Sequence, residues 1–500
     1  MSSESRLVPR RIPACTVWIL LAGLFASAPA TAQFVEPGTV VIHTILGEFA
    51  GDQHGWVSQD LGDLNGDGIC DFIIGAPGVD GGGNNRGRLY VYSGATGAFL
   101  FTPITGTINN GRLGNAVGAV TDVNGDGVTD IVAGAPSNNA GRAFIYSGAT
   151  GAQLRSFIGQ ASGDQFGSSC RGIGDINTDG IGDVVIGAPL HDTNGTSSGR
   201  AYVYSATSTP SLLCTLNGGD ATDQFGGACD VVGDVNSDGV PDFIISAETF
   251  AIGAGAGTGR AYVYSGAACV TPPVAPPPLR TLSPTGLAGA FSQYFLDGEG
   301  DVNNDGTPDI YVADFNVNKA YIFSGANGSL IRTHTGDGNG GFGIGRITGD
   351  VDDDGWADML LCAWLSDAGA TQAGKAFVYS GRTGGLLQTF THTIANAHFG
   401  FDANPLGDVN GDGKPDFLVT AADDVGFRGT SYVLAGNTPR FSRADIDLDG
   451  DVDSQDATSL AEVLLGMSIN STHIKRGDVD RDGKRDGHDV TAFVQAALTP

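Results

Sequence analysis

The sequence is poor in positive charge and almost lacks glutamate. Its 500 residues include 26 Lys and Arg against 55 Asp and Glu, and only six of these acids are Glu. Nucleic-acid binding needs clusters of Lys and Arg, so the composition argues against a nucleic-acid partner. A generic solvated acidic face would use both acids. Asp has the shorter side chain, which suits tight turns built from oxygen ligands, so its excess directs attention to metal-binding loops.

Long apolar runs are also missing, apart from one at the N-terminus. Val17–Ala28 is apolar but too short for a stable membrane span, and it lies between a basic segment (residues 6–11) and the small-residue cleavage pattern Ala30–Ala32. We expect residues 1–32 to be an export signal peptide and the mature chain to contain no transmembrane segment. The protein is therefore predicted to be secreted or held at a cell surface by a partner.

Familiar catalytic motifs are absent as well. The chain has no H-E-x-x-H, no G-x-S-x-G and no Walker loop, and its eight His are scattered. We assign no catalytic residue and expect a binding protein more than an enzyme.

Cysteines are few and show no CxxC spacing. Cys170 and Cys229 occupy matching places in adjacent repeats, and Cys214 and Cys269 flank one repeat. An exported protein can form disulfides, so these two pairings are candidates among the fifteen connectivities that six mature cysteines allow.

What the chain does contain is one short Asp-rich loop written seven times, each copy running directly into an apolar strand. The copies start at Asp63, Asp122, Asp175, Asp234, Asp301, Asp350 and Asp408. Their spacing of 49 to 67 residues predicts a repetitive β-architecture with one loop per unit.

Each loop has the ligand pattern that Ca²⁺ prefers. Side-chain oxygens occupy positions 1, 3, 5 and 9, a backbone carbonyl is available at position 7, and Gly at position 6 permits the sharp turn. The predicted Ca²⁺ ligands, in loop order, are Asp63, Asn65, Asp67, Ile69, Asp71; Asp122, Asn124, Asp126, Val128, Asp130; Asp175, Asn177, Asp179, Ile181, Asp183; Asp234, Asn236, Asp238, Val240, Asp242; Asp301, Asn303, Asp305, Thr307, Asp309; Asp350, Asp352, Asp354, Trp356, Asp358; and Asp408, Asn410, Asp412, Lys414, Asp416. The ions either gate recognition or pin each turn, and recurrence in every unit favours the structural role.

Two further patterns accompany the loops. An aromatic-Gly turn such as Phe166-Gly167 precedes four of them, and a Gly-Ala-Pro corner such as Gly75-Ala76-Pro77 ends the strand after the first three. A later strand alternates aromatic residues on one face, for example Tyr90 and Tyr92. Such a face could stack on sugars, but its repetition favours packing between neighbouring sheets.

These three patterns in register resemble the FG-GAP repeat, the blade unit of the integrin α-chain β-propeller. The resemblance covers roughly residues 34–440 and implies an all-β fold with seven blades. The last unit lacks its final strand, and Thr39–Leu46 has the character of that missing strand. We therefore expect the N-terminal segment to complete the last blade and close the ring.

The C-terminal segment, residues 441–500, carries two loops of a different kind, each leading into an amphipathic helix. Both have an Asp at position 12, where an EF-hand has Glu. The helices are marked by Leu460 and Leu464 in one repeat and by Val490, Phe493, Val494 and Ala497 in the other. The predicted Ca²⁺ ligands are Asp445, Asp447, Asp449, Asp451, Asp453, Asp456 and Asp478, Asp480, Asp482, Lys484, Asp486, Asp489.

Duplicated loop-helix units with Asp at position 12 are similar to a dockerin type I domain. The resemblance implies a small α-helical calcium-binding module that binds a cohesin-like domain or surface scaffold. Partner-reading positions would be Ser454 and Gln455 in one repeat and Gly487 and His488 in the other. The alternative is a calcium-stabilised cap that folds on the propeller. The tripeptide Arg476–Asp478 is interpreted as a chance match to an integrin-ligand motif, because Asp478 begins a calcium loop.

The whole pattern predicts an exported, calcium-binding recognition or adhesion protein. Its propeller would engage a protein or glycan ligand on one face, and its tail would dock to a cohesin-type partner. The alternative is a polysaccharide-degrading lyase or hydrolase on a propeller scaffold. A unique cluster of His, Arg or Tyr over the central channel would favour that alternative.

Overall fold

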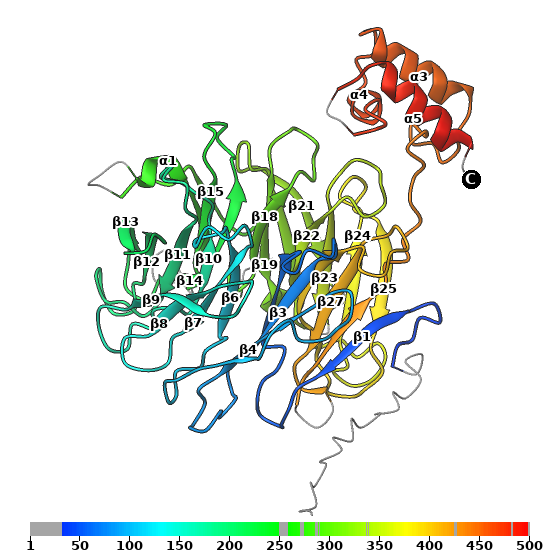
Figure 1. Cartoon of the computed structure of the whole chain (residues 1–500). Helices are drawn as coiled ribbons and strands as arrows, with labels where there is room; N and C mark the ends of the chain where they lie inside the picture. The colour runs from blue at the N-terminus through cyan, green and yellow to red at the C-terminus, as the bar shows by residue number, and fades with distance from the viewer. Residues whose placement is uncertain are drawn as a thin grey trace, which may run out of the picture.

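The computed structural model describes residues 33–498, apart from residues 250–258, 271–274, 286–288, 290, 337, 339, 425–427 and 482–483. The predicted signal peptide and the predicted ligand Asp482 lie outside this range. Seven four-stranded antiparallel sheets form the blades of a β-propeller, and the helices of a small C-terminal module follow (Figure 1). The prediction of a seven-bladed β-propeller is confirmed.

Each blade consists of four consecutive strands, except the seventh, which takes its fourth strand from the N-terminus. In blade order the strands are β2 (Val57–Gly62), β3 (Asp71–Ala76), β4 (Arg88–Tyr92), β5 (Ile104–Thr105); β6 (Ala116–Val120), β7 (Asp130–Ala135), β8 (Arg142–Tyr146), β9 (Gln153–Ile158); β10 (Cys170–Gly172), β11 (Asp183–Ala188), β12 (Arg200–Ser205), β13 (Ser211–Asn217); β14 (Phe225–Gly233), β15 (Asp242–Ala247), β16 (Arg260–Tyr264), β17 (Arg280–Leu282); β18 (Leu296–Gly300), β19 (Asp309–Asp314), β20 (Lys319–Phe323), β21 (Leu330–Thr335); β22 (Phe342–Gly349), β23 (Asp358–Ala363), β24 (Lys375–Tyr379), β25 (Leu386–Thr391); and β26 (Phe399–Gly407), β27 (Asp416–Ala421), β28 (Thr430–Leu434), β1 (Val41–Leu46).

The first strands of the blades form the inner ring of the propeller. Strands β2, β6, β10, β14, β18, β22 and β26 contact one another in this order, and β26 returns to β2. The ring is closed by β1, which pairs antiparallel with β28 from His43 opposite Val433 to Leu46 opposite Thr430. This pairing confirms the predicted closure by the N-terminal strand, and it covers an edge that would otherwise be open.

Neighbouring blades are joined by apolar clusters that cross from one sheet to the next. Phe72, Ile74, Tyr90 and Tyr92 of blade 1 pack with residues of blade 7 such as Leu418 in one buried cluster. These aromatic rings are therefore buried between neighbouring sheets, as predicted, and do not form an exposed platform for sugar stacking.

The aromatic-Gly turn and the small-residue corner meet between blades. A Cβ on Gly75, at the corner of blade 1, would lie 2.3 Å from the carbonyl oxygen of Gly114 in blade 2. The same approach recurs between Gly134 and Gly167, at 2.0 Å. Only glycine permits backbones to come this close, which explains why the two short patterns occur together in the sequence.

One of the two candidate disulfides is present. Cys214 in β13 is bonded to Cys269 in the short helix α1 (Gly266–Cys269), as proposed. The Cys170–Cys229 pairing is wrong, because both thiols are free and buried. These two cysteines lie in the inner strands of adjacent blades, and the Cys229 thiol donates a hydrogen bond to the Ser169 hydroxyl at 3.4 Å instead. Equal positions in a repeat are not by themselves adjacent in space.

The C-terminal module, residues 441–498, follows the last blade. It contains α3 (Ser454–Leu464), α4 (Ser471–Arg476) and α5 (Gly487–Leu498). The core of the module is small and centres on Ile446, Leu460 and Val479. A separate single-turn helix, η2 (Phe315–Val317), lies within blade 5 of the propeller. No helix among the described residues has the length and apolar character that a membrane crossing needs.

The predicted apolar face of the last helix is only partly buried. Phe493 packs on the small core of the module, but Val490 and Val494 are exposed. The helix instead turns Asp489 inward, because this carboxylate accepts the backbone N–H of Val479 at 2.7 Å. The two valines are thereby left on the outer surface.

Candidate metal centres and the central ring

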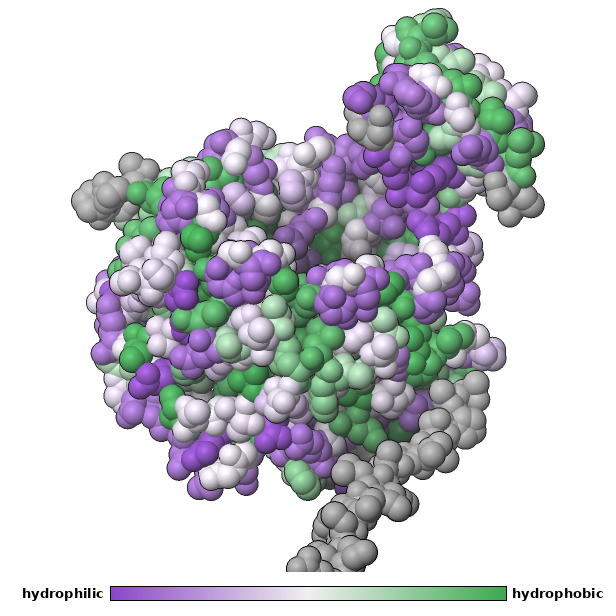
Figure 2. Space-filling model, in the orientation of Figure 1, coloured by the Kyte–Doolittle hydropathy of each residue, from purple (hydrophilic) through white to green (hydrophobic). Residues whose placement is uncertain are grey.

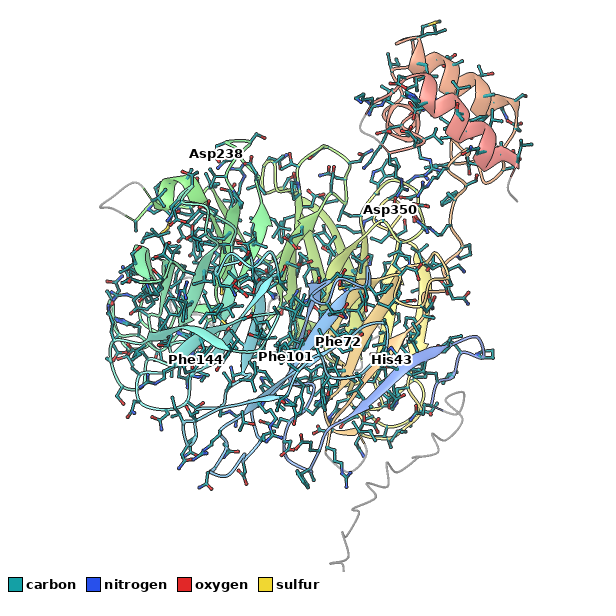
Figure 3. All side chains as sticks on the ribbon, in the orientation of Figure 1. His43, Phe72, Phe101, Phe144, Asp238 and Asp350 are labelled. Carbon is teal, nitrogen blue, oxygen red and sulfur yellow. A yellow bond between two sulfur atoms is a disulfide. The ribbon has the colours of Figure 1, made fainter. Side chains whose placement is uncertain are left out.

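The seven Asp-rich loops link the first and second strands of each blade, so all lie at the same end of the propeller. Figure 3 labels Asp238 and Asp350 at this end, and the C-terminal module lies beyond Asp350. In the first loop the Asp63 carboxylate accepts the backbone N–H groups of Gly66 and Gly68, both at 2.7 Å. Asn65 and Asp67 accept the N–H groups two residues on. The short polar side chains thus shape the turn that carries them.

The Asp at position 9 makes a contact that sequence reasoning missed. Both oxygens of Asp71 are used: one accepts the N–H of Leu64 at 2.9 Å, and the other accepts the N–H of Gly94 at 3.0 Å. Gly94 is the second residue of the pair Ser93-Gly94, the Ser-Gly corner that directly follows the third strand. The signal was in the sequence, because that corner recurs with the loop.

This tie recurs in other blades, where a buried position-9 Asp also bonds the glycine after the third strand. The pairs are Asp130 with Gly148, Asp242 with Gly266, Asp309 with Gly325, Asp358 with Gly381 and Asp416 with Gly436. Burial raises the pKa of Asp242 and Asp416 to about 6 and of Asp183 and Asp309 to about 7.

The residues present suit a hard divalent cation in the sixth loop. Asp350, Asp352 and Asp358 each offer a carboxylate oxygen, and these oxygens lie within 4.8 Å of one another. The Oδ1 atom of Asp350 is buried without a hydrogen-bond partner. A buried carboxylate oxygen without a donor is costly, and a cation would remove that cost.

The same test is met in the C-terminal module. Asp445, Asp447 and Asp456 form one such set, and Asp478, Asp480 and Asp489 form another. Oδ1 atoms of both Asp445 and Asp447 are buried without a hydrogen-bond partner. The position-12 carboxylate of Asp456 folds back to accept the N–H of Ile446 at 2.6 Å, so it closes the loop on the helix start.

The sixth loop has a distinct electrostatic environment. Burial, reinforced by the neighbouring Asp352 carboxylate, raises the pKa of Asp358 to about 8. Burial likewise raises the pKa of Asp352 to about 7. Although burial acts in the opposite direction, Arg481 and Arg440 hold the pKa of Asp353 below its usual value. One loop therefore combines crowded carboxylates with a carboxylate that is neutralised by arginines.

A second polar cluster lies in the inner ring, and it was not predicted from the sequence. Seven residues, one per blade, face the third residue of the adjacent strand: Gln59, Gly118, Arg171, Asp230, Asp297, Arg346 and Asn404. Their register equivalence is invisible without the strand pairing. Six of the seven residues are polar or charged, but the first strands differ too much in sequence for an equivalent position to be recognised.

The members of this central ring bind one another across the propeller axis. Arg171 donates to Gln59 and pairs with Asp230 at 2.7 Å. Arg346 donates from Nε to Asn404 at 2.6 Å and lies 3.8 Å from Asp230. Gly118 provides room, because a Cβ there would lie 3.1 Å from Cδ of Arg171. The two arginines thus connect blades that are distant in sequence.

The ring bears on the enzyme alternative, which required a cluster of this kind near the axis. Its two arginines are committed to ion pairs and hydrogen bonds within the ring. Burial raises the pKa of Asp297 to about 7, and Asp230 adds to this effect. Each arginine pairs with buried carboxylates, so the ring has a structural role in linking blades, and we assign no catalytic residue to it.

The integrin-ligand tripeptide is not displayed. Arg476 is the last residue of α4, and its side chain is buried with its Nε donating to the carbonyl of Asp445 at 3.0 Å. This placement supports the interpretation of the tripeptide as a chance match.

Comparison with known proteins agrees with the propeller. A model described as FG-GAP-like repeat matches residues 63–133 and 301–361, and the FG-GAP repeat model matches residues 172–204 and 403–434. Integrin alpha-V of Gallus gallus is 31% identical over 233 residues, covering 44% of this chain and 22% of that protein. Integrin alpha-11 of Homo sapiens is 33% identical over 142 residues, covering 25% and 12%. Integrin alpha-5 of Xenopus laevis is 29% identical over 218 residues, covering 41% and 20%.

The fold and these matches define the class of protein: an FG-GAP β-propeller similar to the corresponding part of integrin alpha chains. The chain spans about a fifth or less of the length of these curated relatives.

Proposed function

We propose that this protein is an exported, calcium-binding recognition or adhesion protein. The observation that carries the proposal is the closed FG-GAP propeller with Asp-rich loops gathered at one end, in a chain similar to integrin alpha propellers. A rigid propeller presents loops from seven blades on one surface, which suits binding of a protein or glycan ligand. The excess of Asp in the loops over the rest of the chain fits a protein that works where Ca²⁺ is abundant.

Calcium is the proposed resident ion. The residues that would hold it are the loop carboxylates, such as Asp350, Asp352 and Asp358 in the sixth blade. When bound, Ca²⁺ supplies positive charge that offsets the repulsion among carboxylates held a few ångströms apart. The chain's own residues shape the turns and, in six of the seven blades, tie the loop to the glycine after the third strand, so the proposed role of the ion is to stabilise the recognition face.

The C-terminal module is proposed to dock to a cohesin-type partner. Val490, Val494 and Leu498 recur every four residues along α5 and are 45%, 48% and 78% exposed. Leu465 and Met467, just after α3, are also exposed. An apolar stripe of this kind on a small exported module favours a protein partner that covers it.

A capture experiment tests the docking. The full mature chain would be used as bait in secreted and envelope fractions of its host, with Ca²⁺ and then with chelator. We expect capture of a cohesin-bearing protein in Ca²⁺ only. Val490→Glu with Val494→Glu should abolish capture because the charges would be buried at the interface, whereas Thr491→Glu on a neighbouring exposed position should not. Equal capture by both variants, or capture in chelator, would refute docking through this surface.

Recognition by the propeller needs a separate assay. The mature chain would be screened on immobilised glycans and extracellular-matrix-type proteins in Ca²⁺ and in chelator. The proposal expects binding that persists in the Val490→Glu, Val494→Glu variant, since the propeller and the stripe on α5 are different surfaces. Loss of all ligand binding in that variant would assign recognition to the module instead.

A further inference from the structure

The sixth Asp-rich loop departs from the other six at three positions. Position 3 is Asp352, where the other six loops have Asn, and the two departures that concern the module are Asp353 at position 4 and Trp356 at position 7. Position 4 elsewhere is Gly66, Gly125, Thr178, Ser237, Asn304 and Gly411. The backbone at Asp353 has φ of +63°, a left-handed conformation that favours Gly or Asn. Asp353 is the one charged residue at position 4 among the seven loops, so its charge is the feature to be explained.

The explanation is a group of cations from the C-terminal end of the chain that converges on Asp353. Arg440 lies 2.6 Å from its Oδ2 atom, and Arg443 lies 4.0 Å from the same atom. Arg481 pairs with its Oδ1 atom and also lies 4.0 Å from Asp350. Three arginines thus meet one carboxylate.

Arg476 joins the contact through the backbone. Its guanidinium donates to the carbonyl groups of Asp353, Ser442 and Asp445. One side chain thus connects the sixth blade, the segment around Ser442 that joins the last blade to the first loop of the module (the linker), and that loop itself. A backbone bond adds to it, since the N–H of Phe441 donates to the carbonyl of Asp352 at 2.7 Å. Arg476 is buried, and a buried, fully engaged guanidinium fixes geometry more strongly than a surface pair.

Trp356 provides the second half of the contact. The Lys475 ammonium lies 5.8 Å from the centre of its ring, and the Arg382 guanidinium of blade 6 lies 5.4 Å from it. In other loops position 7 is a smaller residue, such as Val128 or Thr307. The departures at positions 4 and 7 therefore both serve the contact with the module.

The contact faces one way and the apolar stripe another. Arg440, Arg443, Lys475, Arg476 and Arg481 are five of only 26 basic residues in the chain, and all gather at the sixth blade. Figure 2 shows hydrophilic residues on the side of the module that faces the propeller and hydrophobic residues on its outer side. Val490 and Val494 of the stripe stay exposed in this arrangement.

We propose that the sixth blade is an intramolecular seat for the C-terminal module, held by arginines around Asp353 and by Lys475 on Trp356, which leaves the apolar stripe of α5 free. The seat is inferred from this set of contacts and does not depend on the proposed function. The orienting role does rest on the proposed function: a partner bound to the stripe would hold the propeller in one fixed orientation, because the module would bind the partner on one side and the propeller on the other.

The test uses the full mature chain in saturating Ca²⁺. Asp353→Asn keeps a residue that tolerates the left-handed backbone but removes the charge, and Arg481→Gln removes the charge of its partner. Ser237→Asn, at position 4 of the fourth loop, is the matched control. Small-angle X-ray scattering reports the maximum dimension, and trypsin reports access to the linker after Arg440 and Arg443.

We expect a larger maximum dimension and about tenfold faster linker cleavage in Asp353→Asn and in Arg481→Gln, because proteolysis follows the population of the open form. The double variant should show little change beyond Asp353→Asn, since that substitution already removes the main partner of Arg481. High salt should open the wild type in the same way, and Ser237→Asn should match the wild type.

Scattering and cleavage unchanged in both charge variants would overturn the seat. Should a variant lower the propeller melting temperature, salt-dependent hydrogen exchange of α4 in the wild type gives the same answer without substitution. Partner capture separates the two proposals. If the seat is intact but no partner is captured, only the orienting role is refuted. If the wild-type chain captures a partner although its module is already mobile, only the seat is refuted.

Discussion

The sixth Asp-rich loop and the first share spacing and backbone shape but not surroundings. Asn65, Gly66 and Asp67 of the first loop are exposed, whereas Asp352, Asp353 and Asp354 of the sixth are buried beneath the C-terminal module. The comparison teaches that departures from a repeat carry information. Residues that recur in every blade serve the fold of the blade itself. A residue that breaks the repeat, such as Asp353, marks a contact between that blade and another part of the chain.

The largest expected effect comes from removing metal, which tests whether the two kinds of loop depend on the same ion. Each site occupied at 100 times its Kd would stabilise the folded chain by about 2.7 kcal/mol, so several sites together predict a sharp fall in melting temperature in excess chelator. Calorimetry of the mature chain with Ca²⁺ and with chelator measures it. An unchanged melting temperature would sink the structural role of the ion.

The second-largest effect tests whether Arg346, which blade 6 contributes to the central ring, stabilises the fold. Arg346→Met removes a buried guanidinium that lies 3.7 Å from Asp402 and hydrogen-bonds Asn404. Leaving buried carboxylates without their partner should cost about 3–5 kcal/mol of unfolding free energy, measured by urea denaturation. The control is Arg88→Met, which breaks a partly exposed pair with Glu48 and should cost at most about 1 kcal/mol. Equal costs would argue that the central ring is not a structural network.

The third effect concerns the packing between blades 5 and 6, away from the sixth Asp-rich loop. His334 of β21 packs on Tyr379 of β24 with ring centres 4.6 Å apart, and burial lowers its pKa to about 4. The unfolded chain takes up a proton near pH 6.5 while the folded chain does not, so stability is lost as the pH falls from 6.5 toward 4. The loss should be about 2 kcal/mol between pH 7 and pH 5.

His334→Phe keeps a ring on Tyr379 but cannot be protonated. Urea unfolding at both pH values in saturating Ca²⁺ should therefore show a pH dependence smaller by about that amount in the variant. The same pH dependence in wild type and variant would mean that another group is responsible.

The smallest effect probes the seat itself. Lys475→Met keeps the aliphatic stem and removes the charge from the face of Trp356, a change worth about 0.5–1 kcal/mol at a partly exposed site. Hydrogen exchange of α4 should become a few-fold faster. Lys375→Met, which removes a cation 4.7 Å from the ring centre of Phe377 in the same blade, should leave the exchange of α4 as it is. Faster exchange in both variants would point to a general loosening of blade 6.

Much of the propeller could be predicted because its determinants are local. The loops, the small-residue corners and the alternating aromatic strands are short patterns, and the missing last strand pointed directly to β1. The bond between Cys214 and Cys269 was also anticipated. The loops, corners, aromatic strands and missing strand rest on residues that are close in sequence or on the count of strands per blade. The disulfide joins cysteines 55 residues apart and was anticipated because they flank one repeat.

The remainder depends on contacts that no local pattern encodes. The central ring joins Arg171 to Asp230 and Arg346 to Asn404, and its members become equivalent only through strand register. Cys170 and Cys229 occupy equivalent places yet do not bond, since equivalent positions lie in different blades. The seat joins Asp353 to residues that follow it by 87 positions (Arg440) to 128 positions (Arg481). The sequence shows the unusual residues of the sixth loop but not what they contact.

Counting bound ions tests the central claim most directly. The mature chain would be equilibrated with Ca²⁺, desalted, and weighed by native mass spectrometry alongside elemental analysis. Seven loops in the propeller and two in the C-terminal module predict nine Ca²⁺ per chain, and eight in an Asp350→Asn, Asp352→Asn variant of the sixth loop. A chain that retains no Ca²⁺ at millimolar concentration would contradict the account.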